Sequence, residues 1–317
     1  MSTVQSQAIT DTVQAYVYYR SSCSGRIRIA LNLKGITPTY KYVNLVNKEQ
    51  RSEEYTRVNP SHTVPTLIIT PSSGGPPTKI TQSIPALEYL EEAYPSLRPL
   101  LPKDLSARAT VRTLTALIAA DVQPITNLSI LNRVDAIGGD KAVWAREIMT
   151  AGFEAFEAII KDTAGEFSVG DEISMADVVL VPAVWGAERF GVDFGALPTV
   201  KRVYEKLAAM EEVKKAHWSR QEDTPAELRQ CEFARYYDIG RGRGTLILNL
   251  DGVFAEEKGG RLKLAVFDGV LVVEGGGSNG VIARAAARSH LHRGLSFCVN
   301  QEETEMISER VARYISP

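Results

Sequence analysis

The chain has 317 residues, of which 44% are hydrophobic and 23% charged, so its length and composition predict a globular protein of about two domains. Its formal net charge of −2 argues against a partner such as nucleic acid or an anionic membrane surface. Cys23, Cys231 and Cys298 lie far apart without partners at metal-ligand spacing, so we expect neither a disulfide framework nor a bound metal.

The start of the chain, MSTVQSQAITDTVQ, has neither the basic segment nor the apolar core of a secretion signal. No run of apolar residues approaches the ~20 that a membrane-spanning helix needs. The low cysteine content suits a reducing compartment. We therefore expect a cytoplasmic protein that does not enter the membrane.

The first third of the chain alternates between strand and helix patterns. Residues 15–20 are aromatic and β-branched, which predicts a strand, and SSCSG separates it from RIRIALNLKG, whose apolar residues have helical spacing. There follow a strand over 40–45, a charged helix over 48–57, a hairpin of VPTLIIT and KIT around PSSGGPPT, and a helix over 83–93. This order, βαβ and then ββα, predicts a thioredoxin-like α/β domain over residues 13–96.

Helical periodicity dominates after the proline-rich linker YPSLRPLLP. We expect an all-α domain over residues 103–229, and the predicted helices cover residues 105–120, 140–161, 174–188 and 197–216. Ser174 and Asp177 have the spacing of a capping box, in which the acid accepts from the backbone N–H of the serine while the serine hydroxyl caps the free N–H groups of the helix. Asp177 is therefore predicted to be structural.

The composition changes beyond Arg229, where RGRG, KGG and EGGG raise the glycine content. TLILNL, LKLAVFDGVLVVE and FCVN are candidate short strands, and Asp268-Gly269 is a candidate tight turn. RGRG and GGGSNG lack both the GK[ST] ending of a phosphate loop and Rossmann spacing. Three readings stay open for this tail, residues 230–317: a small added domain, a flexible appendage, or a stretch that never evolved as protein. We favour the last two.

Hydroxyl and thiol side chains cluster at Ser21, Ser22 and Cys23, between the first predicted strand and helix. The free N–H groups at a helix start stabilise a thiolate and lower its pKa. A small thiol bound beside these hydroxyls would therefore be partly ionised and nucleophilic at neutral pH. Two other readings stay open: a serine-rich helix cap with a buried cysteine, or Cys23 itself as the nucleophile, although CxxC is absent.

Two further signals flank the predicted hairpin. Val64-Pro65 enters its first strand, where a cis proline of a thioredoxin-like fold exposes a backbone edge that pairs with an extended peptide; an ordinary turn is the alternative. Gln82-Ser83 opens the next helix, where amide, hydroxyl and N–H groups suit a carboxylate or form a simple cap. The three signals together predict a ligand with a thiol, a peptide-like middle and an amino-acid carboxylate, which is the anatomy of glutathione.

Over residues 15–229 the chain resembles the zeta class of glutathione transferases. The resemblance rests on SSCSxRIRIALxLKGI, VNLV, NPxxxVPTL, QSIPALEYLEE, WAREIMTAGFEAFE, VGDEISMADVVLVPAVWGAERFGVD and QEDTPAELR. It implies a thioredoxin-like domain followed by a helical one, a homodimer, and glutathione as cofactor. The implied reaction is the cis–trans isomerisation of maleylacetoacetate to fumarylacetoacetate, in phenylalanine and tyrosine breakdown.

The resemblance also implies roles for single residues. The residues that it places at the glutathione thiolate are Ser21, Ser22 and Cys23. Those that it places along the rest of the tripeptide are Val64, Pro65, Gln82, Ser83 and, from the helical domain, Gln123. Arg189 matches the arginine that receives a substrate carboxylate, which a guanidinium can do with two parallel hydrogen bonds. An ion pair on the helix surface is the alternative for Arg189.

Three positions depart from the family pattern. Gly25 stands where the family usually has tryptophan, which is expected to remove a wall of the pocket and widen substrate tolerance. Thr63 replaces a glutamine that touches glutathione, so weaker affinity is expected, and Thr126 also replaces a glutamine.

Two other functions stay open. One is a detoxifying transferase that conjugates electrophiles or dehalogenates α-halo acids, which the glycine at position 25 favours. The other is a glutathione-fold binding protein without turnover, against which the retained Ser21, Ser22 and Cys23 argue.

Overall fold

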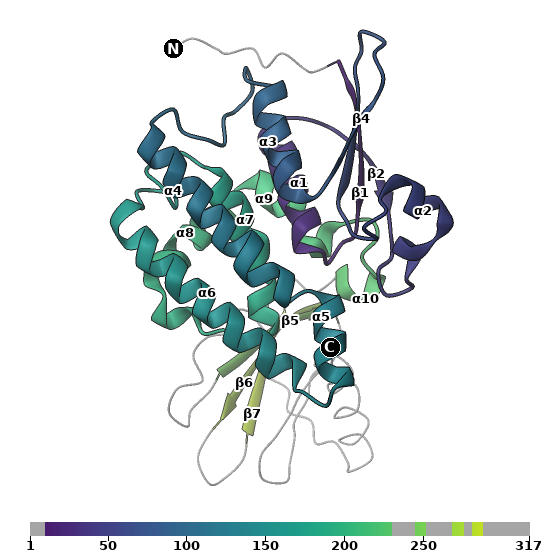
Figure 1. The fold of residues 1–317 in the computed structure, drawn as a ribbon. Helices are drawn as coiled ribbons and strands as arrows, with labels where there is room; N and C mark the ends of the chain where they lie inside the picture. The colour runs from purple at the N-terminus through teal and green to yellow at the C-terminus, as the bar shows by residue number, and fades with distance from the viewer. Residues whose placement is uncertain (1–9, 230–244, 252–267, 276–280, 288–317) are drawn as a thin grey trace. The chain divides into compact units, whose positions relative to one another are not determined.

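The computed structural model describes residues 10–229, 245–251, 268–275 and 281–287 (Figure 1). The chain forms two compact units, residues 1–223 and 224–317. The first unit holds both the strand–helix region and the helical region predicted from the sequence.

A mixed sheet organises the beginning of the first unit. Its elements are β1 (Thr12–Val17), α1 (Ser22–Leu33), β2 (Thr39–Tyr42), η1 (Glu49–Arg51), α2 (Glu53–Val58), β3 (Thr66–Thr70), β4 (Thr78–Thr81) and α3 (Ser83–Ala93). The strand order is β2-β1-β3-β4, with β1 parallel to β2 and antiparallel to β3, and β3 antiparallel to β4. This is the predicted thioredoxin-like arrangement, and the family comparisons described below confirm it.

The sheet is covered on both sides, since Figure 1 shows α1 and α3 on one side of it and α2 on the other. Apolar side chains of β1, β3, α1 and α3 form the core between them, and the largest fully buried ones are Ile27, Ile29, Leu31, Leu67, Ile69, Leu87 and Leu90. The first strand begins and ends three residues earlier than predicted. Tyr18 and Tyr19 are buried like strand residues, but their backbone has left the sheet and turns toward α1, with Ser21 N–H donating to Tyr18 O.

The helical part of the unit contains α4 (Leu105–Ala116), η2 (Leu117–Val122), η3 (Gln123–Ile125), α5 (Leu128–Ala136), α6 (Lys141–Thr163), α7 (Met175–Arg189), η4 (Phe194–Ala196), α8 (Pro198–Ala208), α9 (Glu211–Ala216) and η5 (Trp218–Arg220). The prediction of one helix over 197–216 is wrong, because Met210 adopts an extended backbone between α8 and α9. No glycine or proline marks this break. The helix α5, which Asn127 caps by accepting from Ser129 and Ile130 N–H, was not predicted.

Helix α7 lies at the centre of this part, and most of its residues are buried. Ser174 and Asp177 form the predicted capping box. The Asp177 carboxylate accepts from the N–H groups of Ser174 at 2.8 Å and Ser168 at 2.9 Å. Asp177 is fully buried, and burial raises its pKa. Its hydrogen bonds are therefore structural, as predicted.

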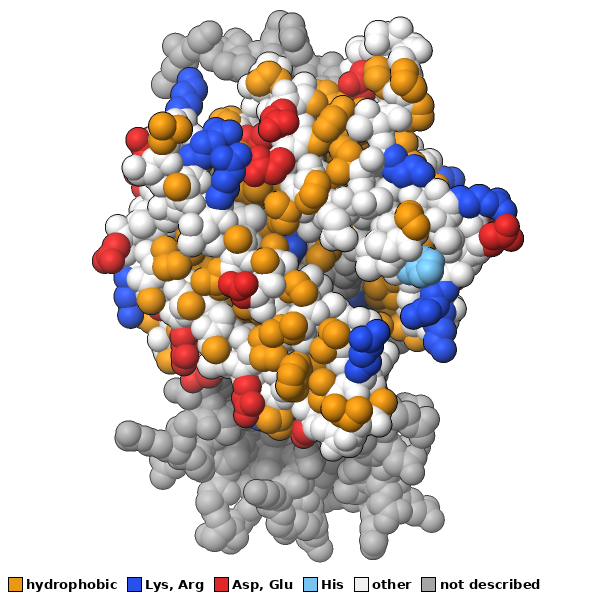
Figure 2. Space-filling view, in the orientation of Figure 1, with side chains coloured by type: hydrophobic (Ala, Val, Ile, Leu, Met, Phe, Trp, Pro, Cys, Tyr) orange, Lys and Arg blue, Asp and Glu red, His pale blue; other side chains and the backbone are white. Residues whose placement is uncertain are grey.

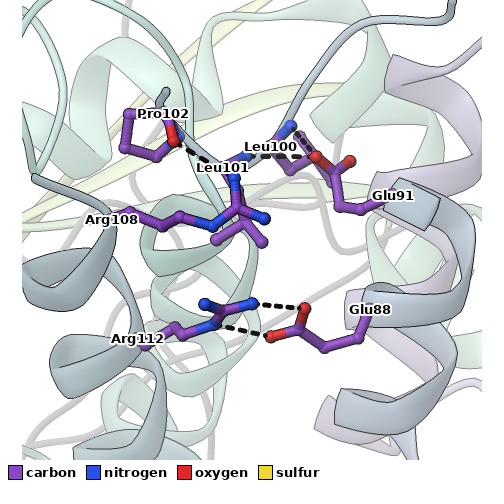
Figure 3. A network of polar contacts seen from close by, with 7 residues as sticks. All are labelled: Glu88, Glu91, Leu100, Leu101, Pro102, Arg108 and Arg112. Carbon is purple, nitrogen blue, oxygen red and sulfur yellow. Dashed lines mark hydrogen bonds and ion pairs between the residues drawn. The ribbon is translucent and has the colours of Figure 1, made fainter. Parts of the chain in front are cut away.

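The proline-rich linker is held in place at the joint between α3 and α4 (Figure 3). Glu91 of α3 accepts from the N–H groups of Leu100 and Leu101 and forms a buried ion pair with Lys34, the residue that caps the end of α1, 2.5 Å apart. Closer to α4, the Arg112 guanidinium binds both carboxylate oxygens of Glu88, at 3.0 and 2.9 Å. A carboxylate that is met by two guanidinium donors fixes orientation as well as distance, so this surface pair links α3 to α4.

The helical run Leu105–Ala136 is long and apolar enough, by length and composition alone, to cross a membrane, contrary to the expectation that no such run exists. The run is interrupted by η2 and η3, and Val111, Leu114, Ile118 and Val122 within it are buried in the core. This pattern is typical of core helices in a folded domain. Figure 2 shows further hydrophobic side chains at the surface over α5 and the adjoining end of α6; the most exposed are Ile125, Leu128, Ile137 and Trp144.

The second unit contains α10 (Ala226–Arg229) and an antiparallel sheet in the order β5-β6-β7, made of β5 (Thr245–Asp251), β6 (Asp268–Gly275) and β7 (Val281–Ala287). The prediction of a turn at Asp268-Gly269 is wrong, because both residues pair with β5 as the beginning of β6. An Asp-Gly dipeptide permits a turn without enforcing one, and here the apolar VLVV run that follows extends its strand backward. FCVN and residues 262–267 lie outside the described residues.

Candidate functional site

The strand register brings three loops to one edge of the sheet. Tyr16, near the end of β1, lies opposite Thr66, the first residue of β3. Thr66 also lies opposite Thr81, the last residue of β4. The segment that follows β1, the residues that precede β3 and the residues that follow β4 are therefore neighbours (Figure 1). These are the loops that carry the three sequence signals.

The first loop ends at the start of α1, where Ser21 is the N-cap. Its Oγ accepts from Ser24 N–H at 3.1 Å. The side chains of Ser21, Ser22 and Cys23 are all partly exposed, and no acidic residue lies in the first turn. Because a hydroxyl that accepts one hydrogen bond still has its own hydrogen to donate, the capping and thiolate-binding readings of Ser21 are compatible.

The second loop contains Val64-Pro65, whose peptide bond is cis. The carbonyl of Thr63 accepts from Tyr55 Oη at 2.6 Å and from Asn59 Nδ2 at 2.8 Å. These bonds hold the backbone that approaches the proline. The exposed hydroxyl of Thr63 lies 2.8 Å from Ser61 Oγ.

The third loop turns at Gln82, an exposed residue with a φ of +78°, which side-chain-bearing residues rarely adopt. Ser83 then begins α3 with its side chain buried. Its Oγ accepts a hydrogen bond from Arg26 Nη1 of α1 at 3.1 Å. This bond joins the start of α3 to α1, and sequence reasoning missed the arginine that makes it.

Two arginines lie close to the first loop. Arg189, the last residue of α7, is exposed, yet the surrounding protein lowers its pKa to about 10, and the positive charge of Arg20 acts in the same direction. Among the described residues no carboxylate lies within ion-pair distance of Arg189, so the predicted alternative, a surface ion pair, is not found. Its guanidinium lies 4.6 Å from the ring centre of Phe190.

Sequence reasoning also missed Arg20, whose guanidinium lies 5.9 Å from the ring centre of Trp218. Its position directly before SSCS was the one signal that the sequence offered. Arg20 directly precedes Ser21, and its charge acts on Arg189 of the neighbouring helix α7. Such a pair suits a ligand with more than one carboxylate.

Buried polar contacts fix the backbone of Tyr18 and Tyr19, which leads into α1. The Arg28 guanidinium donates to Tyr18 O at 3.3 Å, to Tyr19 O at 3.0 Å and to Ala216 O at 3.0 Å. Tyr19 N–H donates to the Asp223 carboxylate at 2.7 Å. Residues 216 to 223, from the last residue of α9 onward, therefore hold the first loop in place.

Gln123 is the first residue of η3 and is partly buried. No hydrogen bond joins its side chain to another residue in the described part of the chain, so its contact with glutathione stays a prediction. Thr126, three residues further along the chain, is one of the departures from the family pattern; it is buried and donates from Oγ1 to Val122 O at 2.9 Å. Its hydroxyl is used within the helical domain.

The expectation that Gly25 opens the pocket is wrong. Gly25 is buried where α1 packs on α7, and a Cβ added there would lie 3.0 Å from Pro182 Cβ and 3.2 Å from Trp185 Cζ3. The indole of Trp185, which is 9% exposed, fills the space beside the glycine. It packs edge-to-face on His217, with ring centres 4.9 Å apart.

Cys23 carries a free thiol. Within the described ranges, no group of three or more His, Cys, Asp or Glu side chains is placed to hold a metal ion. The groups that the described residues place at this sheet edge include hydroxyls, one thiol, helix N–H groups and guanidinium groups.

Similarity to known proteins covers the same part of the chain. Residues 20–93 match the glutathione S-transferase N-terminal domain, and residues 138–220 match the glutathione S-transferase C-terminal domain. A maleylacetoacetate isomerase of Emericella nidulans is 54% identical over 221 residues, which are 68% of this chain and 96% of the relative.

Two solved structures are also similar. One is maleylacetoacetate isomerase from Anaeromyxobacter dehalogenans with bound dicarboxyethyl glutathione and citrate in the active site, with a TM-score of 0.63 and 37% identity over 69% of this chain and 97% of that one. The other is a maleyl pyruvate isomerase, a bacterial glutathione S-transferase of the zeta class, with a TM-score of 0.62 and 33% identity over 67% of this chain and 100% of that one.

Proposed function

We propose a function from one premise: this chain belongs to the zeta class of the glutathione S-transferase family. We propose that it is an isomerase that uses glutathione to convert maleylacetoacetate into fumarylacetoacetate, in phenylalanine and tyrosine breakdown. The observation that carries the proposal is the meeting of three loops at one sheet edge, with Arg20 directly before Ser21 and its charge acting on Arg189.

The residues at this edge fit glutathione. Ser21 and the first N–H groups of α1 would stabilise the thiolate. The backbone of Val64, before the cis proline, would pair with the cysteinyl part of the tripeptide. Gln82 and Ser83, at the start of α3, would hold the γ-glutamyl carboxylate. Ser22, Cys23 and Gln123 complete the proposed set.

When bound, glutathione supplies a thiolate that adds reversibly to the conjugated cis double bond, which lets the bond rotate before the thiolate leaves. The chain's own residues carry out three tasks. Ser21 and the start of α1 hold the sulfur as an anion. Arg189 and Arg20 orient the two substrate carboxylates. N–H and hydroxyl donors stabilise the negative charge that develops on the substrate carbonyl.

The test is glutathione-dependent isomerisation of maleylacetoacetate by the wild type and by Ser21→Ala, measured side by side. We expect wild-type turnover to require glutathione, and Ser21→Ala to lower kcat by about 100-fold, since a lost charge-stabilising donor has that order of effect. Ser22→Ala is the matched control with a smaller expected effect. Absence of turnover by the wild type would contradict the proposal.

Assays on the same protein preparation distinguish this isomerase from the two alternatives, a detoxifying transferase and a binding protein without turnover. Faster turnover of an α-halo acid than of maleylacetoacetate would favour the transferase. Retention on immobilised glutathione without turnover would favour a binding protein. The filled space beside Gly25 removes the argument that favoured a wider substrate range.

The proposal extends to a cytoplasmic homodimer and to the division into residues 13–96, 103–229 and 230–317. Val46 and Leu105 are exposed apolar side chains that contact with a second copy would cover. Light scattering after size exclusion should give about twice the mass of one chain. The mass of a single chain across a concentration series would contradict it.

A further inference from the structure

Arg26 is a buried charge that has no carboxylate partner among the described residues. It lies in α1, is 2% exposed, and forms no ion pair with a described residue. Its only hydrogen bond within the described part of the chain is the one from Nη1 to Ser83 Oγ, 3.1 Å long. The other two nitrogens, Nε and Nη2, are buried and have no hydrogen-bond partner in the part of the chain that the structure describes. Burying a charge this way opposes folding, so the arginine calls for another explanation.

The bond to Ser83 determines where the serine hydrogen is directed. A guanidinium only donates, so Ser83 Oγ is the acceptor. The hydroxyl hydrogen is therefore left to bond another acceptor. Arg26 and this hydroxyl thus form a chain of two hydrogen bonds. The buried charge polarises the serine oxygen and makes its hydrogen a stronger donor.

The start of α3 offers further donors at the same place. The first N–H groups of a helix have no partner within it. Here Pro85 has no N–H, and Ala86 N–H donates to Gln82 O at 3.3 Å. The N–H groups of Ser83 and Ile84 are therefore the ones left to bind a ligand. No acidic residue lies in the first turn of α3. Two N–H groups, one polarised hydroxyl and a buried cation behind it make a site for one carboxylate.

We propose that Arg26 is a positioning residue for this site: through Ser83 it aligns the hydroxyl donor that holds the γ-glutamyl carboxylate of glutathione. The inference rests on the proposed function, because that function supplies the ligand. Arg26 does not touch the ligand, and its charge is compensated only when the carboxylate is bound.

One consequence separates this role from a structural one. Because Nε and Nη2 have no partner among the residues that the structure describes, replacing Arg26 by the apolar Arg26→Met removes an uncompensated buried charge. Such replacements are often neutral or stabilising. We therefore expect a melting temperature equal to or above that of the wild type, together with weaker glutathione binding. If Arg26 instead served the fold, Arg26→Met would lower the melting temperature and leave glutathione binding unchanged.

The experiment measures glutathione dissociation constants by calorimetry for the wild type, Arg26→Met, Arg26→Lys, Ser83→Ala and the Arg26→Met/Ser83→Ala double variant. We expect Arg26→Met to raise Kd about tenfold or more, with a smaller rise for Arg26→Lys. In the Ser83→Ala background, Arg26→Met should change Kd by less than about threefold, because the serine transmits the effect. Arg112→Met, which removes a surface cation that binds Glu88 of α3, is the matched control and should leave Kd unchanged.

A second ligand identifies the group that Arg26 serves. Glutathione whose γ-glutamyl carboxylate is converted to an amide should bind the wild type and Arg26→Met with similar Kd. Unchanged binding of glutathione by Arg26→Met, an equal loss for the amide, or a lowered melting temperature with unchanged affinity would each overturn the inference. If the wild type itself binds no glutathione, the proposed function fails, and this inference with it.

Discussion

Replacing Gly25 by alanine adds one methyl group between α1 and α7. In a helix the change alone favours folding by about 1 kcal/mol. The new Cβ, however, would lie 3.0 Å from Pro182 Cβ and 3.2 Å from Trp185 Cζ3, closer than the ~3.5–4.0 Å of ordinary carbon contacts. Overpacking of this kind costs about 1–3 kcal/mol. We therefore expect Gly25→Ala to lower the free energy of unfolding by about 1 kcal/mol.

Gly186 is the matched control, because it also lies inside a helix, α7. Among the described residues, a Cβ there would meet only Met149 Cε, at 3.9 Å. Gly186→Ala should raise the free energy of unfolding by about 0.5–1 kcal/mol. Urea unfolding with equal m values is the assay. A stabilisation by Gly25→Ala equal to that by Gly186→Ala would refute the packing argument.

A swap extends the same reasoning. Trp185→Ala should cost about 3–5 kcal/mol through the cavity it leaves, and Gly25→Trp alone should disrupt the packing of α1 on α7. Combined, the two changes exchange the positions of the indole and the small residue. We therefore expect the double variant to be more stable, by at least ~2 kcal/mol, than the sum of the two single effects on the free energy of unfolding would give. Additive effects would show that the two positions do not share one space.

Three further predictions follow from the same structure. Burial lowers the pKa of His217 to about 3. A histidine that is kept neutral in the fold contributes stability above its unfolded pKa of about 6.5, and this contribution is lost as the pH falls toward 3. Between pH 7 and pH 5, the free energy of unfolding of the wild type, measured in urea, should therefore fall by up to about 2 kcal/mol more than that of His217→Gln. Arg189→Met and Arg20→Met should each raise the KM for maleylacetoacetate about tenfold while the Kd for glutathione stays constant, and unchanged KM in both would remove them from the substrate site. Removing residues 230–317 should leave isomerase activity intact, and a large loss on truncation would show that this part of the chain supports the site.

Local signals were sufficient for several elements and side-chain roles. Helix α3 spans residues 83–93 as predicted, because its apolar face has helical spacing. Asp177 caps α7 because its partner Ser174 is three residues away. The cis bond at Val64-Pro65 was expected from the fold order. Each of these depends on near neighbours in the chain or on the order of the elements, which the sequence states directly.

The break between α8 and α9 at Met210 and the pairing of Asp268 with Asp251 were not visible in the sequence. Neither position carries a residue that forces its conformation, so contacts made elsewhere in the fold decided them. The same holds for Thr126, whose hydroxyl is used within the helical domain.

What the sequence alone determined is which residues the three loops at the sheet edge carry: Ser21, the Val64-Pro65 pair and Gln82-Ser83. The tertiary structure decided which charges stand behind and beside them. Arg26 reaches Ser83 across 57 residues of chain, and Trp185 fills the space beside Gly25 from another helix. Such pairs arise from strand register and helix packing, and these depend on the whole core rather than on neighbouring residues.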